Sequence, residues 1–359
     1  MGHGIMAPRQ HIRFRAAPDG VRIAVAETGR GPPLVRAAHW LSHVEYDLES
    51  PVWRPWVEAL SRDHRYIRYD QRGCGLSDRR VHDFSMQGWL SDLEAVTQDL
   101  APEPFPLLGM SQGGAVAIRY ALRHPGRVSR LILVGAYAQG GLSRAETEDD
   151  RLEAETLVNL LRLGWGRDDP LFGQAFSRRF IPGGTAEQLR WWSDLERRNA
   201  EIETAVATLR AFQHIDVREE ARRLDLPVLI LHARGDACVP FAQGRLLAQL
   251  IPGARLVPLE SDNHVLLESE PEWPRFLSEL RSFLAEDGPP ACPGAESLTP
   301  AERAVLALVA QGLPNPVIAA RLRKREKTVR NQVSSILDKL GARSRAEAVA
   351  LARDAVRDA

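Results

Sequence analysis

The sequence predicts an α/β protein with a mostly parallel sheet and an inserted helical segment, followed by a small all-helical domain. Short apolar runs alternate with amphipathic stretches over most of the first 285 residues, as in a parallel sheet covered by helices on both faces. Residues 142–224 show only helical periodicity. A Pro/Gly-rich linker at 286–297 then precedes a tail with the periodicity of short helices. We therefore expect two domains, at about 11–285 and 298–357.

Strands and helices of the first domain can be assigned in order. Asp19-Gly20 favours a hairpin turn because glycine tolerates positive φ, so a β-hairpin is expected from His11 to Thr28. Further buried strands are expected at Leu34–Ala38, Tyr66–Tyr69, Phe105–Leu108, Leu131–Val134, Pro227–Leu231 and Ala254–Leu259. Amphipathic helices are expected at Trp53–Leu60, Leu90–Leu100, Ala115–Leu122, Phe241–Ile251 and Trp273–Leu284.

The helical segment at about 142–224 is expected to form a cap over the sheet. It contains no strand-like run, and glycines and Pro182-Gly183-Gly184 interrupt its helical periodicity. Its aromatic residues fit either of two roles, ordinary core or the apolar roof of a pocket. They are Trp165, Phe172, Phe180, Trp191 and Trp192.

Charge is distributed unevenly along a chain whose formal net charge is zero. Residues 295–359 contain 12 Lys or Arg and 7 Asp or Glu, so this tail carries +5 and the remainder −5. Six of the bases lie between Arg321 and Arg330, with Glu326 as the only acid among them. Such a local field attracts a phosphate backbone, and the alternative is a solvated helix face.

The remaining composition excludes several classes of protein. Cys74, Cys238 and Cys292 are widely separated and include no C-x-x-C pair, so neither a disulfide framework nor a zinc site is expected. No apolar run approaches the roughly 20 residues of a membrane helix, and residues 1–15 lack the apolar centre of a signal peptide. We expect a cytoplasmic protein that does not enter a membrane and needs no metal or cofactor.

Gly109-Met110-Ser111-Gln112-Gly113 is a G-x-S-x-G sequence in the setting that this motif requires. It follows the expected strand Phe105–Leu108 and opens a helix, so Ser111 is expected on a strained turn that exposes its hydroxyl. Gly109 and Gly113 leave room for the close backbone approaches of that turn. Ser111 is therefore a candidate nucleophile.

Two later residues can complete a catalytic triad with Ser111. A serine hydroxyl needs an imidazole to take its proton, and the imidazole needs a carboxylate to fix its tautomer. Asp236 follows the expected strand Pro227–Leu231, and His264 follows the expected strand Ala254–Leu259. The order Ser, Asp, His is the one expected with this motif, so Asp236 and His264 are the candidate acid and base.

Residues from about 20 to 285 resemble the α/β-hydrolase fold family. Besides the triad, Asp70-Gln71-Arg72-Gly73-Cys74-Gly75-Leu76-Ser77 is similar to a D-x-R-G-x-G-x-S loop of many members, and Gly235-Asp236 with Val239-Pro240 is similar to their acid loop. The resemblance implies an oxyanion hole made by the backbone N–H groups of Leu41 and Gln112.

One position departs from the family pattern. Trp40 follows His39 where many members carry glycine beside the oxyanion hole. Either Trp40 narrows or distorts this hole, and losing such a donor costs roughly 100- to 1000-fold in rate, or the backbone N–H groups serve whatever the side chain is. Whether Ser111 turns over a substrate stays open at this stage.

A ligand pocket is expected between Ser111 and the cap. Its candidate lining residues are Trp40, His43, Tyr46, Met110, Trp165 and Trp191. His43 and Tyr46 lie just past the expected oxyanion loop and fit two roles, ligand contact or anchoring of that loop, of which we favour the second.

The tail is expected to form four short helices. Thr299-Pro300 followed by Glu302 is typical of a capped helix start, and Asn315 is expected to cap the next helix with Pro316 at its first position. A third helix is expected from about Glu326 to Leu340. The apolar positions expected to face inward are Val305, Leu306, Leu308, Val309, Ile318, Ala319, Leu322, Val329, Val333, Ile336 and Leu337.

This tail resembles the LuxR-type helix-turn-helix over nearly the whole module. The match is carried by Leu298-Thr299-Pro300-Ala301-Glu302-Arg303, Ile318-Ala319, Glu326-Lys327-Thr328-Val329-Arg330-Asn331 and Leu337-Asp338-Lys339-Leu340-Gly341. The resemblance implies that the third helix enters the major groove of DNA. The candidate DNA-contacting residues are Arg325, Lys327, Thr328, Arg330, Asn331 and Gln332.

Lysine and arginine would mostly contact phosphates, whereas Gln332 or Arg330 can read base edges. Arg325, Gln332 and Pro316-Val317 depart from the residues common in the family, so the operator sequence stays open. The resemblance also implies a homodimer on an inverted repeat of promoter DNA, with Ser344–Val356 as a candidate contact.

The fusion of the two modules indicates a transcription regulator that senses a small acyl or ester-type ligand. Three functions stay open. The favoured one is a ligand-sensing regulator, with or without hydrolysis of the ligand. The others are an ester, lactone or amide hydrolase with an accessory DNA-binding tail, and a pure receptor that keeps the triad only as pocket architecture.

Overall fold

The computed structural model describes residues 9–166, 170–286, 299–310, 313–322 and 324–340, together with Ala342 and Ser344. The chain divides after Leu284 into two compact units. Each unit has a hydrophobic core of its own. The expected linker at 286–297 lies outside the described residues except for Glu286, so the expected domain limits remain predictions.

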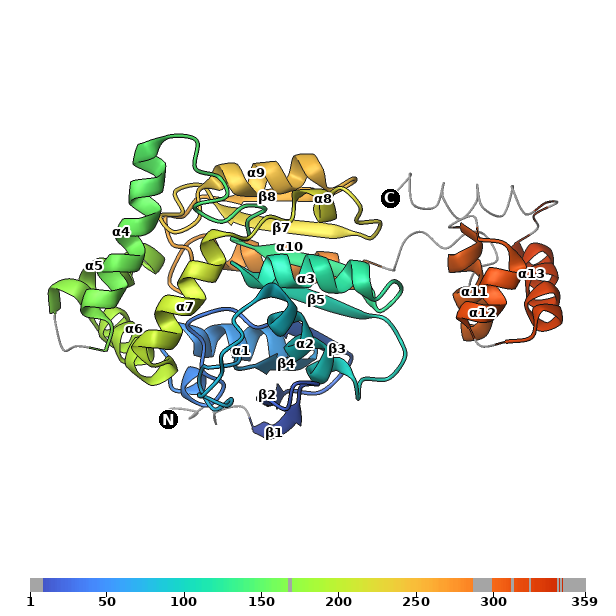
Figure 1. The fold of residues 1–359 in the computed structure, drawn as a ribbon, viewed down its shortest axis with the longest axis horizontal. Helices are drawn as coiled ribbons and strands as arrows, with labels where there is room; N and C mark the ends of the chain where they lie inside the picture. The colour runs from blue at the N-terminus through green and yellow to red at the C-terminus, as the bar shows by residue number, and fades with distance from the viewer. Residues whose placement is uncertain are drawn as a thin grey trace. The chain divides into compact units, whose positions relative to one another are not determined.

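An eight-stranded sheet forms the centre of the larger unit (Figure 1). Its strands lie in the order β1-β2-β4-β3-β5-β6-β7-β8, and every pair from β4 to β8 is parallel. The strands are β1 (Gln10–Ala16), β2 (Arg22–Thr28), β3 (Pro33–Ala37), β4 (Arg65–Tyr69), β5 (Phe105–Met110), β6 (Val128–Val134), β7 (Val228–Ala233) and β8 (Arg255–Leu259). The predicted mostly parallel sheet is confirmed.

The first two strands form the expected antiparallel hairpin. Ala16 pairs with Arg22 at its closed end, and Gln10 pairs with Thr28 at its open end. Gly20 in the turn has φ +87°, a conformation that glycine adopts without strain. The hairpin joins the parallel strands through antiparallel pairing of β2 with β4.

Helices follow the strands in the expected alternation. They are α1 (Trp53–Ser61), α2 (Met86–Thr97), α3 (Gly113–Arg123), α9 (Phe241–Leu250) and α10 (Trp273–Ala285), with a short 3₁₀ turn at Tyr46–Leu48. The limits of α2 differ from the predicted Leu90–Leu100. Its start lies earlier because the Ser85 side chain accepts a hydrogen bond from the Gly88 N–H at 3.2 Å and caps the helix.

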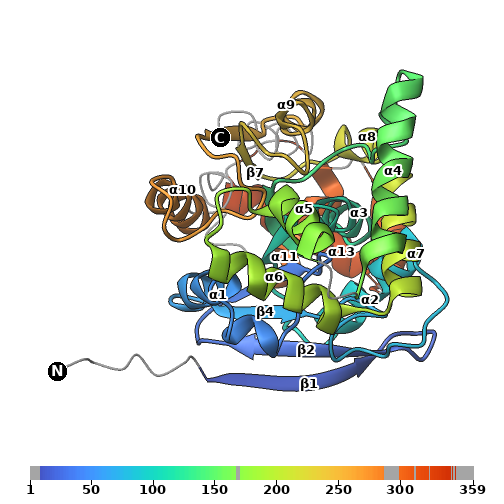
Figure 2. The same cartoon turned by 90° about the vertical axis from the view of Figure 1, so that its left-hand side faces the viewer.

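The segment between β6 and β7 is helical. It contains α4 (Glu148–Gly164), α5 (Pro170–Phe180), α6 (Ala186–Asn199), α7 (Ile202–Gln213) and α8 (Arg218–Ala221). Thr147 and Thr185 begin α4 and α6 with capping boxes. Helices α4 to α7 gather on one side of the larger unit (Figures 1 and 2) and form the cap.

The smaller unit contains α11 (Pro300–Ala310), α12 (Asn315–Arg321) and α13 (Glu326–Leu340). The Thr299 Oγ1 accepts the Glu302 N–H at 3.3 Å while Glu302 accepts the Thr299 N–H at 2.7 Å, so the predicted capped start is confirmed. The predicted cap at Asn315 is wrong, because α12 already begins at that residue and Pro314 precedes it. Most of Ser344–Val356 lies outside the described residues.

The apolar residues assigned to the smaller unit's core do pack together. Buried members include Val305, Ile318, Val329 and Ile336, with Leu306, Leu308, Leu322 and Leu337 partly buried against them. Across the described residues of both units, no helix combines the length and the apolar character needed to span a lipid bilayer.

Candidate active site and DNA-binding surface

Ser111 lies on a sharp turn between β5 and α3. β5 ends at Met110 and α3 begins at Gly113, and Ser111 itself has φ +52°. A Cβ atom at Gly109 would lie 2.6 Å from the Gly114 Cα, and one at Gly113 would lie 2.7 Å from the Ala38 carbonyl oxygen. The strand, turn and helix predicted around Ser111 are confirmed, and glycine is required on both sides of the turn.

Asp236 and His264 meet at the ends of β7 and β8. The His264 Nδ1 donates to Asp236 Oδ2 at 2.7 Å. The other carboxylate oxygen accepts the backbone N–H groups of Cys238 and Val239, both at 2.8 Å. Since both oxygens are held, the carboxylate can fix the imidazole orientation and leave its Nε2 free for proton transfer.

The charge state of Asp236 follows from these contacts. Burial alone would raise its pKa, but the charge and hydrogen bond of His264, the nearby His232 and the Val239 N–H together lower it. The His232 Nε2 lies 3.6 Å from Asp236 Oδ2 and donates to the Val239 carbonyl at 3.0 Å. Asp236 is thus kept ionised beside the imidazole.

Leu41 shares the backbone strain of Ser111. Its φ is +64°, and these two are the only non-glycine residues with positive φ among those described. Within the described part of the chain, neither the Leu41 N–H nor the Gln112 N–H donates a hydrogen bond. Both amides are therefore free to bind a developing negative oxygen, the role that the sequence predicts for them.

Trp40 is held against the cap. Its ring stacks on Trp165 at 5.4 Å and meets the edges of Phe176 and Phe212 at 6.0 Å. The Trp40 N–H donates to Gln112 Oε1 at 3.3 Å, which ties the loop after β3 to the turn that bears Ser111. Through these contacts Trp40 joins the cap to the sheet.

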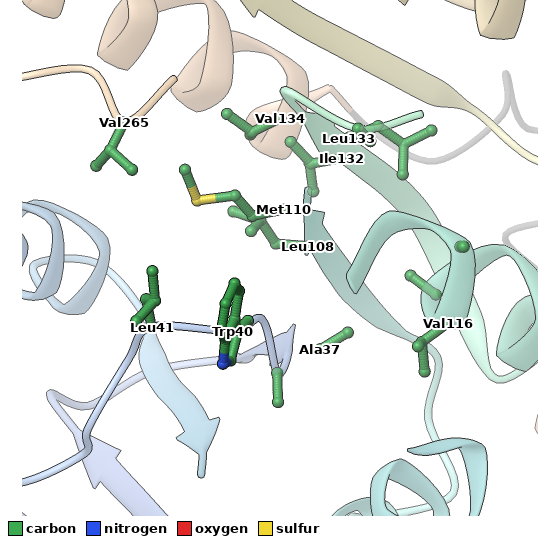
Figure 3. Close-up of a cluster of buried hydrophobic side chains, with 14 of the residues drawn as sticks. Ala37, Trp40, Leu41, Leu108, Met110, Val116, Ile132, Leu133, Val134 and Val265 are labelled. Atoms are coloured by element: carbon green, nitrogen blue, oxygen red, sulfur yellow. The ribbon is translucent and has the colours of Figure 1, made fainter. Parts of the chain in front are cut away.

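A cavity of about 310 Å³ has both Ser111 and His264 in its wall. Its apolar lining comes from the sheet side through Trp40, Trp53 and Met110, and from the cap through Phe176, Phe180, Trp192 and Phe212. The Met110 thioether extends from the end of β5 into the space between Val265 and the pair Trp40 and Leu41 (Figure 3). Polar side chains in the wall include Tyr137, Arg144, Arg179 and Gln213.

Four of the six residues expected to line the pocket do not line this cavity. Trp165 lies behind Trp40, where its Nε1 donates to the Ala200 carbonyl at 2.8 Å. Tyr46 and Trp191 stack on each other at 4.9 Å instead of facing Ser111. The His43 Nδ1 accepts the N–H groups of Glu45 and Tyr46 at 3.3 and 3.2 Å, so His43 anchors its own loop.

The candidate DNA-contacting residues gather around the start of α13. Arg325, Lys327, Thr328, Arg330 and Asn331 are exposed, and Gln332 is half-buried. Val329 and Ile336 face the opposite way, into the core. Exposed bases and amides at the start of a helix are what contact with phosphates and base edges in a major groove requires.

Two of these side chains already have partners within the unit. Arg330 forms an ion pair with Glu326 at 2.8 Å, and the Lys324 Nζ donates to Gln332 Oε1 at 3.0 Å. Arg330 is exposed and can exchange its partner, because an exposed pair of this kind contributes little to stability. Gln332 has its amide N–H groups left to donate to an acceptor.

Glu302 connects the first and third helices of the smaller unit. It accepts the Lys339 ammonium at 2.7 Å and the Ser335 hydroxyl at 2.6 Å. Hydrogen bonds from Lys339, Ser335 and Thr299 hold the pKa of Glu302 well below its usual range. This network fixes α13 against α11 and so orients the exposed start of α13.

Comparison with known proteins assigns both units. Residues 47–271, more than half of the chain, match the alpha/beta hydrolase fold family. The chain belongs to this family. Residues 296–352 match the bacterial regulatory proteins of the luxR family, so the chain joins an α/β-hydrolase domain to a LuxR-type DNA-binding domain.

Relatives of the α/β-hydrolase domain carry different activities in their names. A pimeloyl-[acyl-carrier protein] methyl ester esterase of Nitrosomonas europaea is 30% identical, over 71% of this chain and 97% of its own length. A non-heme chloroperoxidase of Streptomyces lividans is also 30% identical, over 74% of this chain and 98% of its own. An esterase structure from Exiguobacterium antarcticum is 27% identical, with a TM-score of 0.63 over 76% of this chain and 98% of its own.

Sequence reasoning missed most of the cap side of the cavity in this α/β-hydrolase domain. Trp192 lines the cavity whereas its neighbour Trp191 does not, because adjacent residues on α6 point about 100° apart. Phe180 and Trp192 were among the aromatic residues considered for the roof of a pocket, whereas Phe176, Phe212, Arg144 and Arg179 were missed. The buried Leu189 and Leu195, three residues before and after Trp192, mark the inward face of α6 and were the available signal.

Proposed function

We propose that this protein is a transcription regulator whose α/β-hydrolase domain captures a small acyl ester at Ser111 and thereby changes DNA binding by its LuxR-type domain. The observation that carries the proposal is the left-handed backbone shared by Ser111 and Leu41, together with the Asp236–His264 pair, whose imidazole lines the same cavity as Ser111. Strain of this kind persists where the surrounding structure enforces it for function. A pocket that only binds a ligand would not require two residues with strained backbone.

The proposed chemistry is acyl transfer to Ser111. His264 takes the hydroxyl proton as Oγ attacks the ester carbonyl, and Asp236 stabilises the imidazolium. The negative carbonyl oxygen accepts the N–H groups of Leu41 and Gln112. His264 then returns the proton to the leaving alcohol, and water releases the acyl group by the same steps in reverse order.

The cavity supports an acyl group of largely apolar character. Phe176, Phe180 and Trp192 of the cap line it together with Trp40 and Trp53, and Met110, the residue before the nucleophile, also lines it. A volume of about 310 Å³ is at the small end for ligand sites, so the ligand is a compact one. The methyl ester esterase among the relatives is consistent with ester chemistry.

The DNA-binding domain supports a regulatory role for that capture. Its exposed bases around α13 suit promoter DNA, and paired domains of this kind suit an inverted repeat. A ligand changes DNA affinity only if it binds one arrangement of the protein better than another. We expect the protein to work as a homodimer in the cytoplasm, where promoter DNA lies.

The test joins catalysis and DNA binding in one set of samples. The full-length protein and its Ser111→Ala variant are treated with a small alkyl fluorophosphonate, which forms a stable adduct on an activated serine. Hydrolysis of short-chain p-nitrophenyl esters is measured before labelling. Affinity for a duplex selected from a random-sequence pool is measured before and after labelling.

We expect labelling and turnover in the wild type only, and a change of DNA affinity on labelling of at least severalfold. Turnover with unchanged DNA affinity would favour a hydrolase with an accessory tail. A change of DNA affinity after treatment with the fluorophosphonate, together with absent labelling and absent turnover in both proteins, would favour a pure receptor. Absence of all three signals would contradict the proposal.

A further inference from the structure

The outward face of α4 carries an uncharged strip that the fold leaves uncovered. Leu152 is 60% exposed and Leu163 is 66% exposed, and they are the two most exposed of the four large apolar side chains that are exposed among the described residues. Thr156 and Asn159 lie between them and are also exposed. We call these four residues the outer face of α4.

The opposite side of the same helix packs against the cap and lines the cavity. Ala154, Val158 and Leu161 are buried, and α4 packs on α5 and α7. Ala154 and Leu157 also line the cavity that contains Ser111. α4 stands upright at the margin of the cap, beside α7 (Figure 2). Leu152 and Leu163 therefore do not belong to the core and form a second apolar surface on α4.

The spacing of the outer face is that of a helix pairing with another helix. Its members follow one another at intervals of four, three and four residues, which is the heptad alternation that keeps a strip in line with a partner helix. The polar Asn159 and Thr156 at its centre are typical of a strip that fixes the register and orientation of its partner. A membrane surface would not require this alternation.

The charges beside the strip indicate which partner fits. Glu155 and Arg162 flank it on the same side, seven residues apart, and both are exposed. In the described part of the chain neither of them forms an ion pair, whereas Arg151 pairs with Glu148 at 3.2 Å and Arg179 pairs with Glu153 at 3.4 Å. An antiparallel copy of α4 would bring Glu155 of each chain to Arg162 of the other.

We propose that the outer face of α4 pairs with the same face of a second copy of this chain, as an antiparallel helix pair about a twofold axis. Leu152 then packs on Leu163 of the other copy, and Asn159 lies opposite Thr156 of the other copy. A C2 contact must be self-complementary in this way. Two apolar contacts and two ion pairs make a small interface, so we expect micromolar association.

This pairing deepens the proposed function, on which its regulatory meaning rests. One face of α4 lines the ligand cavity and the other joins the two copies, so a ligand that shifts α4 also shifts the partner. Two DNA-binding domains held in one dimer bind paired half-sites with a gain in effective concentration. The pairing itself is tested without ligand or DNA, so its failure is separate from a failure of the proposed function.

The first experiment is sedimentation equilibrium of the full-length protein at 1 to 100 μM, a range of about 100-fold around the expected constant. We expect dimers in the wild type, monomers in Leu152→Glu/Leu163→Glu, and unchanged dimers in Phe14→Glu, which alters another exposed apolar residue, on β1. A monomeric wild type would overturn the proposal. So would a dimer that survives the double change or is lost in Phe14→Glu.

Charge reversal tests the orientation without touching the apolar residues. Glu155→Arg alone and Arg162→Glu alone should each raise the dimer dissociation constant about tenfold, because each places like charges together in both symmetric pairs. The double variant should return it to within about threefold of the wild type. Additive loss in the double variant would rule out the antiparallel arrangement.

Disulfide cross-linking tests the register of the two α4 helices independently. A mixture of Leu152→Cys and Leu163→Cys proteins should form a disulfide-linked dimer on mild oxidation, whereas either protein alone should form far less. Cross-linking of Leu152→Cys with itself would indicate a parallel pair and contradict the proposal. Ester hydrolysis by each variant should remain unchanged, which confirms that the domain is folded.

Discussion

The turn at Ser111 and the start of α13 are the two regions through which this protein is proposed to act, and they are built differently. At Ser111 the important atoms are fixed in three ways. The backbone is strained, an added Cβ atom at Gly109 or Gly113 would lie within 3 Å of other backbone atoms, and both carboxylate oxygens of Asp236 accept hydrogen bonds. At α13 the candidate side chains are charged or polar and mostly exposed, and Arg330 can change its partner.

Because of this difference, catalysis and DNA binding should respond differently to the loss of a single residue. Catalysis at a fixed site depends on a few groups acting as a unit, so the loss of one removes nearly all of the rate. DNA binding through many phosphates is nearly additive, so the loss of one base weakens affinity modestly and changes its salt dependence. The comparison predicts large effects near Ser111 and small, graded effects at α13.

After Ser111→Ala, the largest effect is expected from Asp236→Asn. An amide in place of the carboxylate stabilises the wrong tautomer of His264, and kcat for ester hydrolysis should fall about 10⁴-fold. Steady-state turnover of a p-nitrophenyl ester measures this. Asp262→Asn, a change at an exposed neighbour of the same loop region, is the control and should retain turnover. A loss below tenfold in Asp236→Asn would show that the pair with His264 does not serve catalysis.

Trp40→Gly separates a structural role of this residue from an obstructive one. Removal of a buried tryptophan that stacks on Trp165 should lower the free energy of unfolding by about 3 to 5 kcal/mol and leave kcat no higher. Urea denaturation and ester turnover give both values, and Trp40→Phe should show a smaller loss of stability. A rise of kcat in the glycine variant would instead mean that Trp40 obstructs the oxyanion hole.

The turn around Ser111 could be predicted because its geometry is local. A strand followed by G-x-S-x-G and a helix leaves one feasible backbone, so Gly109 and Gly113 were assigned correctly. The Thr299–Glu302 cap was predictable for the same reason. Pocket lining was only partly predictable. Leu189 and Leu195 mark the inward face of α6 and favour Trp192 over Trp191, but the residues that this face meets are set by packing between segments far apart in the sequence.

The titration of His43 tests how the loop that follows Leu41, a predicted oxyanion residue, is stabilised. Burial, with Arg79 and Arg198 nearby, lowers the pKa of His43 to about 4. Because this value lies below that of an unfolded histidine, the stabilisation is complete above about pH 6.5 and is lost as the pH falls toward 4.

His43→Asn keeps a hydrogen-bond acceptor for the N–H groups of Glu45 and Tyr46 but cannot titrate. Between pH 6.5 and 4 the wild type should lose about 2 kcal/mol more stability than this variant, since solvent screens part of the shift. Urea denaturation at several pH values measures the difference. Parallel stability curves for the two proteins would contradict the neutral, buried state of His43.

The smallest effect is expected from Lys327→Ala at the start of α13. If this exposed lysine neutralises one phosphate, its loss should weaken binding by less than tenfold for all DNA sequences alike, and should reduce the slope of log affinity against log salt by about 1. Fluorescence anisotropy over a range of salt concentrations gives both numbers. Arg30→Ala removes the same charge from an exposed site in the α/β-hydrolase domain and should leave the slope unchanged. Equal changes in both variants would mean that net charge, rather than the position of Lys327 on α13, governs the approach to DNA.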